Sequence, residues 1–205
     1  MIVNNKENAP MRHYTALYAT AAPEALSARC GAPFENGAFH VTMLGQPLRA
    51  AWPDFSLEPE GEGCPAALLG AGTRILIIRY LLEGAAAPPS GKFLTFRELP
   101  WGSVYDKAFQ GRCIQRLAFS FGNRLEAFTR AARRLGGVLL DLGDVACELP
   151  FLGEVHVRLI LRAGDEEFPP TAQFLFSDNA ALAFTAEDLA AVGDIVVSAL
   201  KAVAE

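Results

Sequence analysis

The stretch "GAFHVTMLGQPLRAAW", residues 37–52, decides the fold because it reads as two short strands joined by a tight turn. Apolar and polar side chains alternate on both sides of Gly45-Gln46, and Gly followed by any residue is the signal for a type II′ hairpin turn. Folding there predicts three pairs on one apolar face: Met43 with Leu48, Val41 with Ala50, and Phe39 with Trp52. The opposite face then carries the polar side chains His40, Thr42 and Arg49.

A second hairpin is predicted near the other end of the chain. The segment "EVHVRLILR", residues 154–162, alternates in the same way, and "AGDEEFPP" links it to "TAQFLFS", residues 171–177. Folding about that loop sets Phe174 opposite Leu159 and Phe176 opposite Val157. The other face of this second hairpin carries the polar side chains His156, Arg158, Arg162 and Gln173.

Helices are predicted between and around these hairpins. The sequence predicts a short helix over 21–31, a buried helix over 65–84, a helix begun by a capping box of Asn123 and Glu126, and a last helix begun by Thr185 and Asp188. "VACELPF" is a further strand candidate. Residues 1–10 read as a loose tail and residues 11–205 as a single domain. The expected fold is α+β: a mainly antiparallel sheet, built from two hairpins and extra strands, with helices packed on one face.

Composition excludes several classes of function. The chain has 205 residues, of which 51% are hydrophobic and 20% charged, with a formal net charge of -5. This acidic balance argues against nucleic acid as a partner. The most apolar run, "ILIIRYLL", contains Arg79 and is too short for a membrane span, and no signal peptide is visible, so we expect a cytoplasmic protein. The four cysteines lack metal-binding spacing, which predicts reduced, mostly buried thiols and no metal site.

A ligand site is predicted on the polar side of the sheet. If both hairpins pack their apolar faces on one core, their arginines and histidines share a surface, and arginine binds carboxylate or phosphate in bidentate fashion. The segment "FRELPWGSVYDKAF", residues 96–109, would supply walls. The predicted ligand-binding residues are His40, Arg49, Arg97, Trp101, Tyr105, His156, Arg158, Arg162 and Gln173. The alternative is that this face is only the solvated side of a one-sided sheet.

Two other functions stay open at this stage. In an enzyme, Arg158, Arg49 and His156 would hold a substrate between the sheet and the 96–109 segment. Proton transfer would then fall to His40, Tyr105 or Asp106. In an interaction module, the arginine-rich segment 112–134 would contact a protein partner. No P-loop, nucleophile elbow or His-Glu-x-x-His occurs, so the sequence assigns no reaction, catalytic residue or cofactor.

Three motifs, "FLTFRELPWGSVYDKAF", "FTRAARRLGG" and "AGDEEFPPTAQFLFSDNA", resemble in this order the prokaryotic proteins grouped as domain of unknown function 3786, found mostly in anaerobes. The resemblance runs from about residue 12 to the last helix, and residues 96–100 and 164–170 match its hallmark stretches. Some relatives carry an iron–sulfur module like that of corrinoid proteins, whose cysteine spacing is missing here. The resemblance thus implies, by association, a small anionic or tetrapyrrole-like (corrinoid or heme type) ligand, whose carboxylates or amides suit an arginine face.

Overall fold

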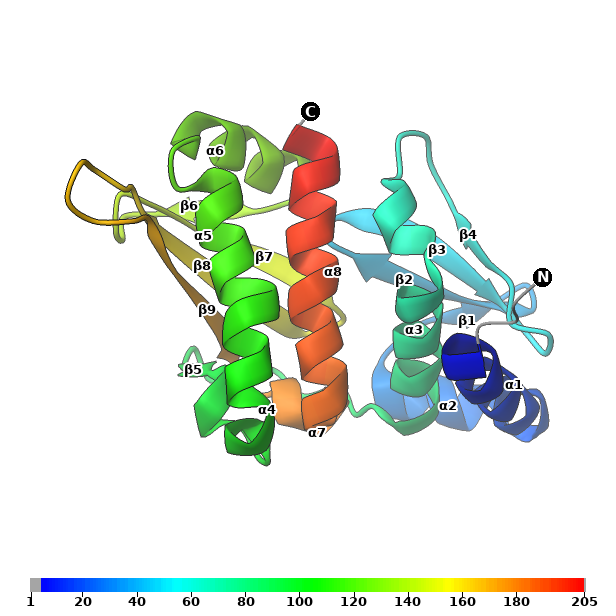
Figure 1. The fold of residues 1–205 in the computed structure, drawn as a ribbon. Helices are drawn as coiled ribbons and strands as arrows, with labels where there is room; N and C mark the ends of the chain where they lie inside the picture. The colour runs from blue at the N-terminus through cyan, green and yellow to red at the C-terminus, as the bar shows by residue number, and fades with distance from the viewer. Residues whose placement is uncertain (1–4, 205) are drawn as a thin grey trace.

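The computed structural model describes residues 5–204, which form one sheet covered by helices on one face (Figure 1). The strand order is β4-β3-β2-β7-β8-β9-β5, with β1 on β2 and β6 on β7, and every pairing is antiparallel. This arrangement confirms the predicted α+β fold. The strands are β1 (Phe34–Glu35), β2 (Ala38–Met43), β3 (Gln46–Ala51), β4 (Leu57–Pro59), β5 (Phe93–Thr95), β6 (Val138–Leu140), β7 (Val145–Leu152), β8 (Val155–Arg162) and β9 (Thr171–Ser177).

The first hairpin forms with a different register from the predicted one. Val41 faces Leu48 and Met43 faces Gln46, so the turn residues are Leu44 and Gly45, with φ of 48° and 71°. Two positive φ values define a type I′ turn instead of type II′, and the predicted pairs are wrong by two residues. A shift of two keeps every side chain on its face. Leu44 accepts the left-handed conformation because it is fully buried and its N–H donates to the Phe151 carbonyl at 3.0 Å.

The second hairpin is confirmed in its register. Leu159 faces Phe174 and Val157 faces Phe176 across β8 and β9. The candidate strand "VACELPF" is β7, which pairs along its length with β8 and is joined to β2 by the single registered pair of Met43 and Leu152. Both hairpins therefore belong to one sheet.

The helices follow the predicted order with some changes at their ends. The helix expected over 21–31 is confirmed, with Gly31 as a left-handed cap at φ 75°. The helix expected over 65–84 is broken at Gly70 into a short 3₁₀ segment and a longer helix. The first helix begins at Asn5, inside the segment 1–10 that the sequence predicts as a loose tail, and residues 1–4 of that tail lie outside the described residues. The helical elements in this part are α1 (Asn5–Thr20), α2 (Pro23–Cys30), η1 (Ala66–Leu69) and α3 (Ala71–Glu83).

The second half of the chain supplies the helices that cross the sheet. Its elements are η2 (Phe96–Glu98), α4 (Gly102–Phe109), η3 (Gln110–Gln115), α5 (Arg116–Phe121), α6 (Leu125–Arg134), α7 (Ala180–Ala183) and α8 (Ala186–Ala204). The predicted capping box of Asn123 is wrong, since Arg124 is the N-cap of α6 and no side chain caps it. The box at the last helix is present, because Asp188 accepts from the Thr185 N–H at 3.1 Å and its own N–H donates to the Thr185 hydroxyl at 3.3 Å.

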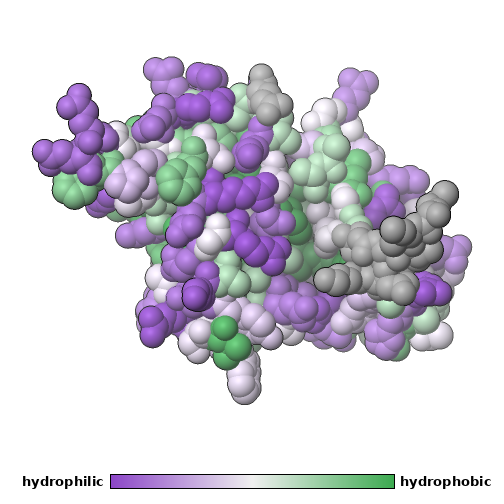
Figure 2. All heavy atoms as spheres, viewed as in Figure 1, coloured by the Kyte–Doolittle hydropathy of each residue, from purple (hydrophilic) through white to green (hydrophobic). Residues whose placement is uncertain are grey.

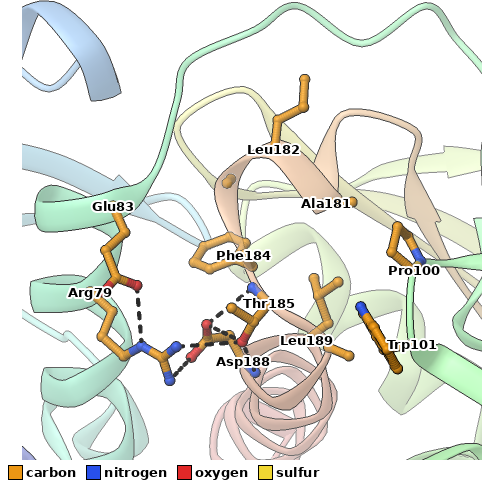
Figure 3. A pocket seen from close by; sticks show the side chains of 12 residues that line it. Arg79, Glu83, Pro100, Trp101, Ala181, Leu182, Phe184, Thr185, Asp188 and Leu189 are labelled. Atoms are coloured by element: carbon orange, nitrogen blue, oxygen red, sulfur yellow. Dashed lines mark hydrogen bonds and ion pairs between the residues drawn. The ribbon is translucent and has the colours of Figure 1, made fainter. Parts of the chain in front are cut away.

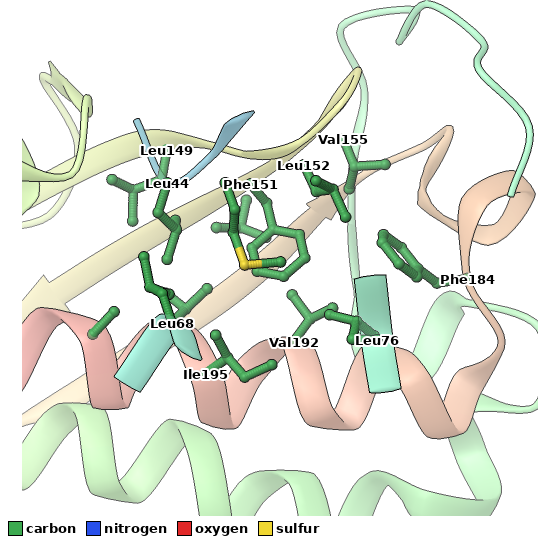
Figure 4. Packing of buried hydrophobic residues seen from close by; sticks show 14 of the residues in the cluster. Leu44, Leu68, Leu76, Leu149, Phe151, Leu152, Val155, Phe184, Val192 and Ile195 are labelled. Atoms are coloured by element: carbon green, nitrogen blue, oxygen red, sulfur yellow. The ribbon is translucent and has the colours of Figure 1, made fainter. Parts of the chain in front are cut away.

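One hydrophobic core connects the first hairpin with β7 and α8. Leu44 at the hairpin turn and Leu149 on β7 point toward Leu68 and toward Val192 and Ile195 of α8 (Figure 4). Each of these side chains is buried, so the junction is sealed by apolar packing. Within residues 5–204, no helix combines the length and the apolar character that crossing a membrane requires.

Candidate ligand-binding cleft

The polar residues of the two hairpins lie on the side of the sheet that the helices leave open. In β2 and β8, the residues packed on the helices are fully or almost fully buried, whereas His40, Thr42, His156 and Arg158 are partly or largely exposed. The alternation of each strand places these four on the opposite face from the core.

Four basic side chains of this open face already contact carboxylates, whereas Arg162 has no such contact among the described residues. His40 Nδ1 lies 2.7 Å from Glu60 Oε1, and Arg49 Nη1 lies 4.0 Å from Glu58 Oε2. On the β7–β8 pair, one carboxylate contacts both a histidine and an arginine. Glu148 lies 3.0 Å from His156 Nδ1 and 2.9 Å from Arg158 Nη2. An anionic ligand on this face would therefore have to displace protein carboxylates from their partners.

The remaining predicted residues lie at separate places. Arg97 and Gln173 line a groove at the edge of β9, and Tyr105 lines a different groove against α8 on the helical side. Arg162 is exposed at the end of β8. The structure thus does not gather the nine predicted residues in one cavity. Tyr105 therefore lies on the helical side, away from the open sheet face on which the enzyme alternative depends.

Three of the six arginines in the segment 112–134 contact α8, whereas Arg124, Arg130 and Arg133 are exposed. Arg116 bonds to Asp194 and to the Ser198 hydroxyl, and Arg112 lies 4.0 Å from Asp194. Arg134 donates to the Val203 carbonyl at 2.7 Å. These contacts tie the segment to α8.

The acidic hairpin tip and the cysteines are held by local hydrogen bonds and by burial. Asp165 accepts hydrogen bonds from the N–H groups of Phe168 and Glu167, and these bonds hold the pKa of its carboxyl below the usual value. Among residues 5–204, no three histidine, cysteine or acidic side chains come together as a metal site would need. All four cysteines are free, and burial raises the pKa of Cys113 and of Cys147 to about 12.

One cleft, which the sequence did not predict, brings together three parts of the chain. It has a volume of about 310 Å³ and lies between α3, the Pro100-Trp101 turn and the α7–α8 region. Figure 3 shows Arg79 and Glu83 at one end, Trp101 and Pro100 at the other, and Phe184, Leu182 and Leu189 between them. Such a mixture of apolar walls and a few convergent polar groups is typical of small-molecule sites.

The polar end is a tightly bonded network. Arg79 Nη1 lies 2.8 Å from Asp188 Oδ1, and Asp188 Oδ2 accepts from the Thr185 hydroxyl at 2.7 Å. The side chains of Arg79 and Asp188 are only 15% and 7% exposed. The capping box of α8 thus also neutralises a guanidinium from α3, while Glu83, 3.8 Å from Arg79 Nε, stays 52% exposed.

The apolar end is marked by an exposed tryptophan in an unfavourable backbone conformation. Trp101 is 78% exposed and has φ of 63°, which is uncommon for a bulky residue. It precedes Gly102, where a Cβ atom would come within 1.8 Å of the Phe96 carbonyl oxygen, so only glycine fits. In Figure 2 a hydrophobic residue and a paler one lie at the lower edge, in the region where Figure 1 has α4, whose exposed residues include Val104 and Tyr105. Strained residues persist where the surrounding structure enforces them, commonly at functional sites.

Two sequence signals pointed toward this cleft without locating it. Arg79 is a charged residue inside the apolar run "ILIIRYLL", and such a residue needs a partner when it is buried. Trp101 was predicted as a ligand wall, but of the sheet's polar face. The contact between Arg79 and Asp188 spans more than a hundred positions in the chain, so no local pattern reveals it.

Comparison with known proteins gives a family. No curated protein and no solved structure matches the chain. A family model with the description "Domain of unknown function (DUF3786)" matches residues 22–199, which include the cleft and all nine strands. Because the match covers most of the sequence, the chain belongs to the DUF3786 family.

Proposed function

We propose that the protein binds a small molecule with a flat apolar body in the cleft between Arg79 and Trp101. The observation that carries this proposal is the position of Trp101, whose exposed indole stands at the mouth of a cleft with a polar far end. An indole exposed in this way offers a stacking surface to a planar ligand. The volume of about 310 Å³ is at the small end of the range for ligand sites.

The charges in the cleft favour a neutral or cationic head group. Its charged lining residues are one arginine and two acids, Arg79, Glu83 and Asp188, so the formal sum is negative. Arg79 is held by Asp188, whereas the carboxylate of Glu83 is the exposed one. A donor or cationic group would bond Glu83 while the flat body stacks on Trp101, a ring that also attracts cations.

The sequence-based proposal of an anionic or tetrapyrrole-like ligand uses the open sheet face instead. Such a ligand would compete with the carboxylates of Glu58, Glu60 and Glu148 for the same histidine and arginine side chains. The two proposals differ in ligand charge and in location. They can therefore be separated by experiment.

The first experiment is native mass spectrometry, with an absorbance spectrum, on protein purified anaerobically from its own host. A bound tetrapyrrole would be visible at once and would support the sheet-face proposal. The second experiment uses matched pairs of planar fragments, each pair being an aromatic amine and its carboxylate analogue. Each fragment is titrated into the protein, and binding is measured as a change in tryptophan fluorescence.

We expect the amines to change the fluorescence of the wild-type protein and the carboxylates to leave it unchanged. Trp101→Leu should remove the response, because the chain's other tryptophan, Trp52, lies outside the cleft. Glu83→Gln should weaken amine binding about tenfold, the loss expected for a charge-assisted hydrogen bond. Equal responses to amines and carboxylates, or a response retained by Trp101→Leu, would refute the proposal.

A further inference from the structure

The outer edge of β9 is covered by a strand along only part of its length. β5 pairs with the last three residues of β9, from Thr95 opposite Leu175 to Phe93 opposite Ser177. After Thr95 the chain leaves the sheet and forms η2, closed by the capping box between Thr95 and Glu98. Residues 171–174 therefore pair with β8 on one side and, within the described chain, have no strand on the other.

The register identifies which backbone groups point to this open edge. The Asp178 N–H donates to the Lys92 carbonyl at 3.1 Å, on the side of β5. In an antiparallel strand every second residue directs its N–H and C=O to the same side. Phe176, Phe174 and Ala172 follow that alternation. Phe176 faces Leu94 of β5, whereas no strand of the described residues 5–204 continues opposite Phe174 and Ala172.

A groove lies along this edge. It has a volume of about 360 Å³, and residues 172–175 form one wall. The opposite wall comes from η2, α4 and η3 and includes Arg97, Asp106, Gln110 and Ile114. Among the residues that the structure describes, neither Arg97 nor Asp106 has an oppositely charged group within 4.0 Å. Arg97 and Asp106 differ in this respect from His40, Arg49 and Arg158 of the open sheet face, which contact carboxylates.

We propose that this edge binds an extended peptide segment of another protein, which adds as an antiparallel strand beside residues 172–174, in line with β5. Backbone donors and acceptors at Ala172 and Phe174 are complementary to the backbone of such a peptide and to little else. A groove between a strand edge and a helix admits one extended chain. The side chains of the guest alternate, so one apolar side chain meets Ile114 and an acidic one meets Arg97.

The shape of the groove favours a peptide over a second copy of this chain. The edge of a second copy would carry the same short strand and the same helical wall, and both walls would have to fit beside one another. An isolated strand brings only its own side chains. Edge strands that stay open in this way are usually blocked by charges or proline, and here the prolines Pro169 and Pro170 lie before the strand, outside the open positions.

The test uses a phage-displayed library of random peptides of about ten residues, selected on the full chain. Ala172→Pro removes the outward N–H and leaves the bonds to β8 in place, because proline has no donor. Ala172→Ser is the matched control, since it keeps the N–H and a small side chain. Selected peptides should bind wild type and Ala172→Ser alike and Ala172→Pro about tenfold more weakly, the effect of one lost hydrogen bond of ordinary strength plus the ring's steric conflict.

Two further readouts keep the proposal open to refutation even if Ala172→Pro fails to fold. Bound peptide should slow hydrogen exchange of the Ala172 and Phe174 amides, and Arg97→Glu should replace the acidic residue that meets Arg97 by a basic one in the selected peptides. Trp101→Leu should leave peptide binding unchanged, because Trp101 belongs to the cleft. The proposal is wrong if no peptide is selected, or if peptides bind while these two amides exchange as before. It is also wrong if the amides become protected with rising protein concentration alone, which would identify a second copy as the occupant.

Discussion

The guanidinium carbon of Arg158 lies 3.8 Å from the centre of the Phe93 ring, while its Nη2 donates to Glu148 at 2.9 Å. Arg158 thus links β8 to β5 across β9 and also holds the carboxylate that positions His156. A residue that reads in the sequence as a free anion ligand is, in the fold, part of the sheet's own packing.

Replacing Arg158 should therefore destabilise the protein. We expect Arg158→Ala to lower the free energy of unfolding by about 2 kcal/mol, from the loss of a half-buried ion pair and of the ring contact. Urea denaturation measures the change. Arg162→Ala, at an exposed position on the same strand, should change stability by less than about 0.5 kcal/mol. Equal effects of the two substitutions would show that the Phe93 and Glu148 contacts contribute nothing.

Gly45 is required by the type I′ turn and by its neighbours. A Cβ atom at Gly45 would lie 3.2 Å from the Gly136 nitrogen and from the Leu135 carbonyl group, whereas one at Gly37, with nearly the same φ, would meet nothing within 4 Å. We expect Gly37→Ala to cost about 1 kcal/mol from backbone strain alone, and Gly45→Ala about 2 kcal/mol. Thermal unfolding compares the two. A smaller loss for Gly45→Ala than for Gly37→Ala would contradict the close approach of the hairpin turn to the end of α6.

The left-handed backbone conformation of Trp101 should cost stability. Because its side chain is 78% exposed, Trp101→Gly loses little packing and relieves the left-handed backbone strain. We expect this substitution to raise the free energy of unfolding by about 0.5 kcal/mol and to abolish the fragment response. Trp101→Leu, which keeps the strain, should lose the response without gaining stability. A loss of stability in Trp101→Gly would show that the indole is a structural contact.

Alkaline pH should weaken the fold through two buried thiols. Burial raises the pKa of Cys147 from 9.0 to about 12, with Glu148 adding to the effect, and burial does the same for Cys113, with Asp194 adding. Between pH 9 and pH 12 the folded protein keeps these protons and the unfolded chain releases them. The stabilising effect is therefore complete below pH 9 and is lost as the pH rises toward 12.

The slope of stability against pH measures this directly. Each thiol should lower the free energy of unfolding by about 1.4 kcal/mol per pH unit in that window. Urea titrations at a series of pH values should show a shallower slope for Cys147→Ala than for wild type, with parallel curves at neutral pH. If the slopes agree throughout, the thiol of Cys147 titrates alike in the folded and unfolded protein.

Much of the sheet was predictable from the sequence because its strands alternate cleanly. Val157 and Leu159 have a strict period of two, and their partners Phe176 and Phe174 follow from the loop that joins the strands. In the first hairpin the same rule gave the correct faces, but Leu44 took the position of a turn residue. Its burial against the core outweighed the preference of Gly45-Gln46 for the turn.

The candidate sites were less predictable because they depend on contacts between distant segments. Local pattern identified Thr185 and Asp188 as a helix cap, yet nothing near them in sequence indicates Arg79 as a third member. The carboxylates that contact the basic side chains of the open face come from β4, from the residue after it and from β7, whose positions the sequence did not provide. The unpaired part of β9 likewise exists only because β5 ends at Thr95.

Little backbone pairing joins β2 to β7. Only Met43 and Leu152 are in register there, and the buried side chains of the core hold the two parts of the sheet together. One wall of the cleft comes from α3 and another from the Pro100-Trp101 turn, so substitutions in that core would alter the distance between Arg79 and Trp101 without touching either residue.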